Sequence, residues 1–312
     1  MSSATPGRSP GPLPPDPEAA LDALAPRLPS PLTEVVDERF ARHGVRLLLK
    51  RDDLIHPDLV GNKWRKLVPT LRTALRDGPR TLLTFGGAYS NHLRATAAAG
   101  RLLGLSTIGV VRGEELADRP LNDSLARCVA DGMRLRFVTR AEYRRRDDPE
   151  WTDRLHDLFG PFLLVPEGGS NAAAVRGAAE LGRELRGAAD VVAVACGTGG
   201  TLAGLAAGLA RGQRAVGFAV LRGGFLAGEV ERLQRAAFGG RRGSWTVEDR
   251  FHCGGFARTT ADLEAFARDF SARHGLPDLD RVYVAKTLYG LSVLAGEGAF
   301  APGTSVAAVV TG

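Results

Sequence analysis

The sequence has few cysteines and no long apolar run. Its three cysteines, Cys128, Cys196 and Cys253, lie far apart and form no Cys-x-x-Cys motif. This usage is typical of a reducing compartment and argues against a disulfide framework or a cysteine zinc site. No stretch reaches the roughly 18–20 apolar residues of a membrane span. The N-terminus also lacks the basic and then apolar layout of a secretory signal. We therefore expect a cytoplasmic protein with no metal site and no membrane partner.

Lysine is also scarce, since only four of the 41 basic residues are lysines and arginine supplies the others. The formal net charge is +6, but the arginines are scattered, with their densest clusters at residues 144–146 and 241–242. No basic helix and no aromatic RNA-binding motif accompanies them. We interpret the charge as a solvated surface and expect no nucleic-acid partner. The same charge favours an anionic small molecule as a ligand.

Short apolar runs alternate with stretches rich in Ala, Leu and Arg along most of the chain. The apolar runs predict strands at residues 45–49, 81–85, 107–111, 135–138, 162–165, 191–195, 215–220 and 306–310. The other stretches predict helices at residues 63–76, 91–103, 121–131, 172–185, 201–210, 226–238 and 260–274. Strands that alternate with helices of this length indicate βαβ units and an α/β fold with mostly parallel sheets.

Glycine is abundant, with 39 residues, and much of it is clustered directly after the predicted strands. The clusters include Gly86-Gly87, Gly168-Gly169, Gly223-Gly224 and Gly254-Gly255. In α/β folds, ligands bind at the carboxyl ends of parallel strands. Because glycine lets the backbone approach a ligand closely, the clusters predict a ligand-binding crevice at this edge.

A loop between a predicted strand and a predicted helix consists of Gly197, Thr198, Gly199, Gly200 and Thr201. A helix N-terminus leaves amide donors unpaired and carries partial positive charge, so this loop can hold an anion such as a phosphate. It lacks the lysine of a Walker loop and the spacing of the dinucleotide fingerprint, which argues against a nucleotide-binding module. A structural turn that binds no ligand remains the alternative.

One of the rare lysines, Lys63, lies in a Gly-Asn-Lys turn at the start of a predicted helix. Arginine provides most of the positive charge elsewhere, so a lysine here suggests chemistry that a guanidinium cannot perform. An amine can form a Schiff base, and an amine with a lowered pKa can act as a base. An ordinary exposed lysine remains the alternative.

A second polar turn, Ser90-Asn91-His92, opens a predicted alanine-rich helix after the strand that ends near Phe85. Capping explains one of the three polar residues, since Ser and Asn are good N-caps. Three adjacent polar side chains next to free backbone amides can bind a carboxylate. His92 could instead be a structural histidine whose ring is satisfied within the core.

Five motifs occur together along the chain, and their order is informative. They are GNKWRKL (61–67), GGAYSNHLRATAA (86–98), EGGSNAAAVRG (167–177), GTGGTLAGL (197–205) and DRVYVAKTLYG (280–290). From about residue 30 to the end, the chain resembles the family of 1-aminocyclopropane-1-carboxylate deaminases and D-cysteine desulfhydrases. These are pyridoxal 5'-phosphate enzymes of fold type II, with a tryptophan-synthase-β-like fold.

The resemblance implies a role for each residue of the first two motifs. Lys63 matches the lysine that binds the cofactor covalently, and Lys66 adds positive charge near the cofactor phosphate. Asn91 matches the asparagine that bonds the 3'-oxygen of the cofactor. Ser90 matches a serine near the substrate carboxylate and the reacting carbon, and His92 belongs to the same substrate-binding turn.

The resemblance also assigns residues in the second half of the chain. The loop 197–201 matches the phosphate loop, and Tyr283 matches an active-site tyrosine. Thr311 falls where related desulfhydrases have a threonine near the pyridine nitrogen. Tyr89 and Tyr289 lie close to the matched motifs and are alternative aromatic donors toward the substrate.

The chain departs from the deaminase pattern in two respects. Deaminases carry a second tyrosine on the last strand, where this chain has Ala308. They also carry an acid near the ring nitrogen, and no counterpart is evident here. Both departures weaken the prediction of a ring-opening reaction, and the sequence leaves elimination and ring opening open.

The activity implied is that of a lyase or deaminase acting on a small amino acid. Lys63 would remove the α-proton, a β-substituent would leave, and the products would be a keto acid and ammonia. Alternatives on the same fold are a racemase, a D-serine dehydratase, a biosynthetic β-replacement synthase or a non-catalytic protein that binds the cofactor.

The resemblance further implies a homodimer and two domains with the site between them. We expect a large cofactor-binding domain of residues 31–80 and 162–312, and a small domain of residues 81–161. Nine of the eighteen prolines lie within residues 1–31, a density that opposes helices and strands. Residues 1–30 are therefore expected to be largely disordered.

Overall fold

The computed structural model describes residues 16–59, 61–76 and 78–312 and has an α/β fold. The strands are β1 Leu32–Val35, β2 Arg46–Arg51, β3 Thr81–Gly86, β4 Ser106–Arg112, β5 Met133–Val138, β6 Leu163–Val165, β7 Val191–Cys196, β8 Arg214–Ala219, β9 Ser244–Glu248 and β10 Ser305–Val310. The α-helices are α1 Pro17–Asp22, α2 Glu38–Ala41, α3 Lys63–Arg76, α4 Asn91–Leu103, α5 Asp123–Ala130, α6 Arg140–Arg144, α7 Pro149–Phe159, α8 Ala172–Glu184, α9 Gly200–Gly208, α10 Leu226–Phe238, α11 Ala261–His274 and α12 Val284–Gly296. Short 3₁₀ turns are η1 Asp52–Leu54, η2 Glu114–Leu116 and η3 Glu167–Gly169.

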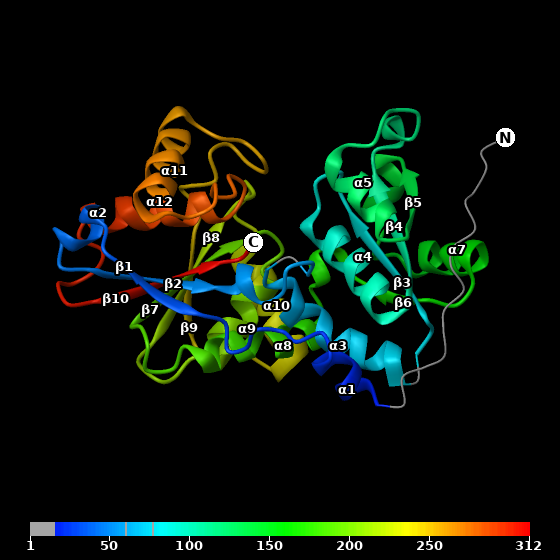
Figure 1. Ribbon diagram of the computed structural model, residues 1–312, viewed down its shortest axis with the longest axis horizontal. Helices are drawn as coiled ribbons and strands as arrows, with labels where there is room; N and C mark the ends of the chain where they lie inside the picture. Colours follow the sequence, from blue (N-terminus) through cyan, green and yellow to red (C-terminus); the bar gives the residue numbers. More distant parts are fainter. Residues whose placement is uncertain (1–15, 60, 77) are drawn as a thin grey trace. The chain divides into compact units, whose positions relative to one another are not determined.

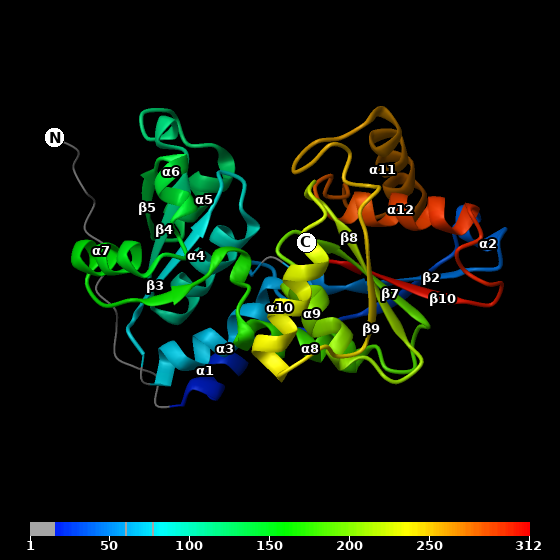
Figure 2. The same ribbon diagram turned by 180° about the vertical axis from the view of Figure 1, so that it is seen from behind.

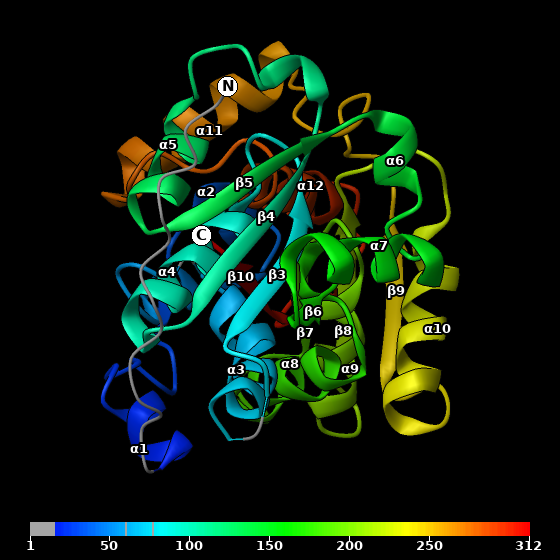
Figure 3. The ribbon, with the colours of Figure 1, turned by 90° about the vertical axis from the view of Figure 1, so that its right-hand side faces the viewer.

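Contacts divide the chain into two units, each with its own sheet. The first unit contains the described residues of 16–26 and 57–169, and its four parallel strands have the order β5-β4-β3-β6. Helices α4 and α5 cover one face of this sheet, while α6 and α7 cover the other (Figure 3). The all-parallel sheet buries both faces, as βαβ connections require.

The second unit contains residues 27–56 and 170–312 and is built on a six-stranded sheet of order β1-β2-β10-β7-β8-β9. Only β1 is antiparallel to its neighbour. Helices α2, α11 and α12 cover one face, and α8, α9 and α10 cover the other (Figures 1 and 2). The central strands β7 and β10 are buried along their whole length.

Helices α8 and α9 of the second unit approach each other through glycines. A Cβ atom at Gly204 would lie 2.3 Å from the carbonyl oxygen of Val175, and one at Gly182 would lie 2.3 Å from that of Leu205. A Cβ at Gly208 would lie 2.0 Å from the oxygen of Ala179. The two helices are therefore in backbone-to-backbone contact, which only glycine allows.

All eight strands and seven helices expected from the sequence are confirmed, with their ends shifted by two residues at most. Helices α2, α6, α7 and α12 were not predicted. The short edge strands β1 and β9 also escaped prediction. Edge strands of this length carry little apolar pattern.

The expectation of disorder is wrong for residues 16–30. Residues 1–15 lie outside the described residues. Residues 17–22 form α1, which begins at Pro17 behind an Asp16 side chain that accepts a hydrogen bond from the Glu18 amide. Proline at the first helical position is favourable, since its missing amide hydrogen would have no helical partner. The abundance of proline concealed this start signal.

The boundary between the units also differs from the expected one. Residues 57–80 and 162–169 belong to the first unit, together with residues 81–161. The reason is that α3 packs against α4 and η3, while β6 pairs with β3.

Candidate functional site

Lys63 is the first residue of α3, directly after a turn in which Gly61 has a φ of +56°. The side chain is half-buried, and burial lowers the pKa of its amine to about 8. Removing water disfavours the charged form of an amine. At neutral pH about a tenth of the amine is therefore unprotonated, compared with less than a thousandth for an ordinary lysine. The neutral amine can act as a nucleophile or as a base.

Lys66 lies one turn further along α3 and is buried. Its ammonium group donates a hydrogen bond to the carbonyl oxygen of Gly168 in η3. Gly168 and Gly169 have φ angles of +65°, which is the left-handed region that favours glycine. Lys66 thus fixes the turn that follows β6.

The polar turn before α4 contains Ser90, the N-cap of that helix. Its hydroxyl oxygen accepts a hydrogen bond from the Leu93 amide at 3.2 Å. A Cβ atom at Gly86 would lie 2.7 Å from this oxygen, so glycine is needed where β3 leads into the turn. Asn91 is half-buried at the first position of the helix. The side chain of Tyr89 is 73% exposed. Of the three tyrosines predicted at the site, it is therefore the one least held by neighbouring residues.

His92 is buried, and its ring is oriented by a short hydrogen-bond chain. The Thr84 hydroxyl lies 2.8 Å from His92 Nε2 and donates its proton to the carbonyl oxygen of Val165, also at 2.8 Å. Because a hydroxyl has one hydrogen, Thr84 must accept from His92, which places the ring proton on Nε2. The second nitrogen, Nδ1, is therefore an acceptor.

The acceptor nitrogen of His92 has no hydrogen-bond partner among the described residues, although it is buried. A Cβ atom at Gly169 would lie 3.4 Å from Nδ1, so this glycine leaves space beside the ring. Burial and then the charges of Lys63 and Lys66 hold the pKa of His92 well below its usual range. The imidazole is therefore neutral at physiological pH and can accept a hydrogen bond from a bound molecule.

We expect Thr84→Val to lower kcat/KM by about tenfold, because the ring of His92 loses the bond that fixes its proton. Thr96→Val is the matched control, since the buried Thr96 hydroxyl donates to the carbonyl oxygen of His92 and does not touch the ring. Steady-state kinetics of both variants checks the prediction. Equal losses in the two variants would show that the bond to the ring has no special role.

In the second unit, strand β7 ends at Cys196 and α9 begins at Gly200. Gly199 is the N-cap, with a φ of +77°, and no side chain of the residues that the structure describes caps the helix. A Cβ atom at Gly199 would lie 2.9 Å from Val230 Cγ2, so both space and backbone angle demand glycine. An uncapped helix start with a glycine-lined approach is suited to an anion.

Two hydroxyl groups lie at this glycine loop. Thr198 Oγ1 is 2.6 Å from Ser170 Oγ, and Thr201 is buried in the first turn of α9. Gly197 opens the loop, and a Cβ atom there would lie 3.7 Å from Cε1 of Tyr283. The Tyr283 ring therefore borders the loop.

Tyr283 is the N-cap of α12, and a buried acid fixes the chain at this point. The Asp280 carboxylate accepts hydrogen bonds from the amides of Val282 and Tyr283 at 3.0 and 2.8 Å. Burial raises the pKa of Asp280. Asp280 and Thr84 were not predicted from the sequence, Asp280 because it lies three residues before the N-cap Tyr283 and not at the capping position itself.

Thr311 follows the last residue of β10 and is buried. In the parallel register, Ala308 of β10 lies opposite Ala193 of β7. Three residues further on, Thr311 is level with Cys196, where the glycine loop leaves the sheet.

Tyr289 lies about one and a half helical turns beyond the start of α12. Its ring packs edge-on against Phe251 and Phe266, with centroids 6.1 and 5.6 Å away, within the apolar core of the second unit. Burial raises the pKa of its hydroxyl. This packing favours a structural role for Tyr289 over donation to a substrate.

Residues 27–312 match the model of the family described as pyridoxal-phosphate dependent enzyme. The chain belongs to this family. Two relatives are candidate 1-aminocyclopropane-1-carboxylate deaminases. The Pyrococcus horikoshii protein is 32% identical over 82% of this chain and 81% of its own length. The Thermotoga maritima protein is 30% identical over 80% of this chain and 84% of its own length.

Comparison with solved structures supports this family assignment and shows the fold type. A structure of an ACC deaminase homologue superposes with a TM-score of 0.77, at 28% identity, over 96% of this chain and 94% of that chain. Threonine deaminase isoform 2 from Solanum lycopersicum superposes with a TM-score of 0.64, at 17% identity, over 100% and 90% of the two chains. The chain is thus a pyridoxal-phosphate-dependent enzyme with an α/β fold of type II.

The residues of each unit fit pyridoxal 5'-phosphate. The cofactor needs a nucleophilic amine for its aldehyde and an anion site for its phosphate. Lys63 offers an amine with a lowered pKa, and the uncapped glycine loop before α9 offers amide and hydroxyl donors. Nδ1 of His92, which is buried and has no partner in the described part of the chain, is a further acceptor for a bound molecule.

The lowered pKa of Lys63 predicts how recombination of the apoenzyme with pyridoxal phosphate depends on pH. Only the neutral amine attacks an aldehyde, so the rate should rise about tenfold per pH unit below pH 8 and level off above it. Stopped-flow absorbance of the bound cofactor measures this rate. Nα-acetyl-lysine serves as a control whose rate should keep rising until near pH 10.4. A profile that follows the free amine would refute a lowered pKa at Lys63.

Proposed function

We propose that this enzyme removes the α-proton of a small amino acid and eliminates a β-substituent, releasing a keto acid and ammonia. The observation that carries the proposal is the Lys63 amine, half-buried at the start of α3 with a pKa of about 8. Such an amine can bind the cofactor and can then exchange a proton with the substrate near neutral pH. The reaction resembles that of D-cysteine desulfhydrases.

The bound cofactor would supply an electron sink for the charge left at the α-carbon. The chain supplies the remaining functions. Lys63 would take the α-proton, and the pKa of about 8 of its amine matches a base that works near neutral pH. The turn of Ser90, Asn91 and His92 holds the substrate carboxylate, and Asn91 orients the cofactor ring.

In the second unit, the loop 197–201 would hold the cofactor phosphate through its amides and hydroxyls. Tyr283, whose ring borders Gly197, would donate to the substrate or its leaving group. Thr311 would face the pyridine nitrogen. Because a hydroxyl is neutral, it would leave that nitrogen less protonated than a carboxylate would.

Elimination is favoured over ring opening by the residue at position 308. The resemblance places a second tyrosine of the deaminases there, whereas Ala308 is buried in the middle of β10 between Leu49 and Ala193. An alanine offers no proton donor. The relatives named as candidate deaminases keep ring opening as the second reaction to test.

The test is a substrate panel of D- and L-cysteine, D-serine and 1-aminocyclopropane-1-carboxylate, with ammonia and keto-acid release as readouts. We expect turnover of a β-substituted amino acid at a rate well above that of the cyclopropane. Racemised but otherwise intact substrate would identify a racemase, and a new β-substituted product with an added nucleophile would identify a synthase. No reaction with any member would leave a non-catalytic cofactor-binding protein.

The proposal includes a homodimer in the cytoplasm, as the resemblance implies. No helix in residues 16–59, 61–76 or 78–312 is both long and apolar enough to cross a membrane. Sedimentation equilibrium of the holoenzyme would measure the oligomeric state. A mass near twice the 33.1 kDa of one chain is expected.

A further inference from the structure

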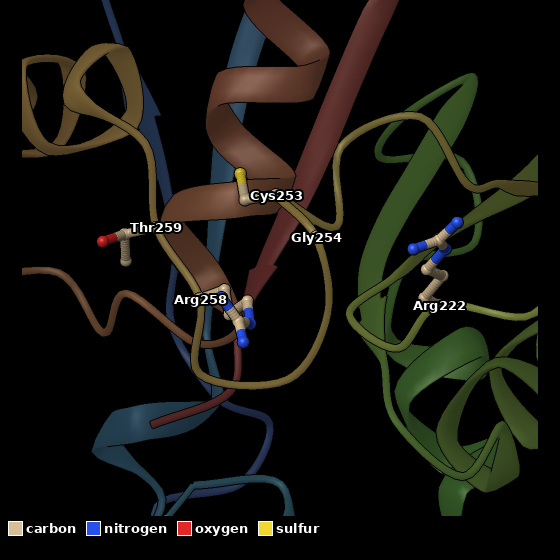
Figure 4. A pocket seen from close by; sticks show the side chains of 5 residues that line it. All are labelled: Arg222, Cys253, Gly254, Arg258 and Thr259. Carbon is tan, nitrogen blue, oxygen red and sulfur yellow. The ribbon is translucent and has the colours of Figure 1, made fainter.

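A cationic pocket in the second unit has no role in the reaction described above. Its volume is about 570 Å³, within the usual range for small-molecule sites. The five lining residues are Arg222, Cys253, Gly254, Arg258 and Thr259 (Figure 4). Two of them are arginines and none is acidic, so the pocket is electropositive.

The two arginines come from loops at the same edge of the sheet. Arg222 lies in the loop after β8, and Arg258 lies in the loop that joins β9 to α11. Strands β8 and β9 are parallel neighbours, so both loops leave at their carboxyl ends. This is the edge at which α/β folds bind ligands.

Both guanidinium groups are available to a ligand. Within the part of the chain that the structure describes, neither Arg222 nor Arg258 forms an ion pair with a carboxylate. Nearby Arg250, in contrast, is paired with both Glu248 and Glu297. Two unpaired guanidinium groups beside one cavity favour an oxyanion as its occupant.

The loop that carries Arg258 is held in a strained shape. Cys253 and Ala257 have φ angles of +56° and +55°, although neither is glycine. The ammonium group of Lys286, which is fully buried in α12, donates to the carbonyl oxygens of His252 and Gly255 at 2.9 Å each. Non-glycine residues held at a positive φ are typically found in binding or catalytic loops.

Contacts within the second unit connect this loop to the proposed cofactor loop. The ring of Phe256 packs edge-on against that of Tyr283, with centroids 6.1 Å apart. Tyr283 in turn borders Gly197, the first residue of the glycine loop. The loop that carries Arg258 therefore contacts, through Phe256, the tyrosine proposed to handle the substrate's leaving group.

We propose that this pocket binds an oxyanion at the far end of the amino-acid substrate, such as the phosphate of an O-phosphorylated β-hydroxy amino acid. The inference rests on the proposed function and narrows its substrate class. In the reaction, the α-proton goes to Lys63, and the Cβ–O bond breaks with its electron pair leaving on phosphate. With one water the products are pyruvate, ammonia and inorganic phosphate.

The experiment compares the D and L forms of serine with the corresponding O-phosphoserines, using the holoenzyme. We expect kcat/KM to be at least about tenfold higher for one phosphorylated form than for its parent, in line with one or two charge-assisted bonds. In Arg222→Gln and Arg258→Gln this ratio should fall toward one. Arg211→Gln, which changes an exposed arginine outside the pocket, should retain the ratio.

A second measurement uses inorganic phosphate as the probe and does not depend on turnover. Phosphate should quench or shift the cofactor fluorescence of the wild-type holoenzyme and compete with O-phosphoserine, and both effects should weaken in the two arginine variants. Phosphate binding without any preference for phosphorylated substrates would overturn the proposal in favour of a free-anion site. Turnover of uncharged amino acids with no effect of either arginine would also overturn it. If no amino acid reacts at all, the proposed function fails first.

Discussion

Lys63→Ala is expected to lower kcat/KM by on the order of 10⁴-fold, because it removes both the covalent attachment and the base. The reason is the position of the amine: it is the first residue of α3, and burial gives it a pKa of about 8. Borohydride reduction of the wild-type holoenzyme should attach one cofactor to the tryptic peptide that contains Lys63. The variant should show no such adduct by mass spectrometry and should lose the visible absorbance of the attached cofactor.

Two variants distinguish the amine's chemistry from its charge. Lys63→Arg keeps a cation but cannot bond an aldehyde or lose its proton near neutral pH, so it should be as inactive as the alanine variant. Lys66→Arg retains a donor for the carbonyl oxygen of Gly168 and should keep most of the activity. An unchanged visible spectrum in Lys63→Ala would show that another group holds the cofactor.

The sequence predicted the repeating part of this fold well, because parallel strands and amphipathic helices carry strong local patterns. Helices α3, α4 and α10 were predicted with the bounds that the structure shows. Helix α7 escaped prediction although its start carries a local signal, with Asp148 as the cap and Pro149 as the first residue, whereas other features depend on tertiary context. Helix α12 is apolar on nearly every side because the core surrounds it, and the division between units follows from α3 packing on α4.

The candidate site was predicted from glycines and rare lysines, whose chemistry can be interpreted from local sequence. The structure adds residues that orient or position the predicted site residues. Thr84 sets the tautomer of His92 from a different strand, and Asp280 fixes the backbone at Tyr283. The cationic pair Arg222 and Arg258 lies on two loops 36 positions apart among many other arginines. No local pattern could have distinguished these two, because only the topology brings β8 and β9 together.

Gly204→Ala is expected to lower the free energy of unfolding by about 2–3 kcal/mol, near the upper end of the usual effect of overpacking. The added Cβ atom would lie 2.3 Å from the carbonyl oxygen of Val175 and 2.6 Å from the Cβ of Ala178. Two helix backbones must separate to make room, because no flexible side chain lies in the way. Helix α9 also carries the glycine loop at its N-terminus, so its displacement should weaken binding of the cofactor phosphate as well.

Gly228→Ala is the matched control for this prediction. It also places an alanine inside a helix, α10, but nothing lies within 4 Å of the added atom. There the intrinsic preference for alanine should raise stability by about 0.5–1 kcal/mol. Urea unfolding of both apoenzymes and titration with pyridoxal phosphate give the two readouts. If Gly204→Ala proves as stable as Gly228→Ala, then α8 and α9 do not meet through their backbones. The glycine loop would then need a different support, because the close contact with α8 is what fixes the direction in which the N-terminus of α9 presents its amides.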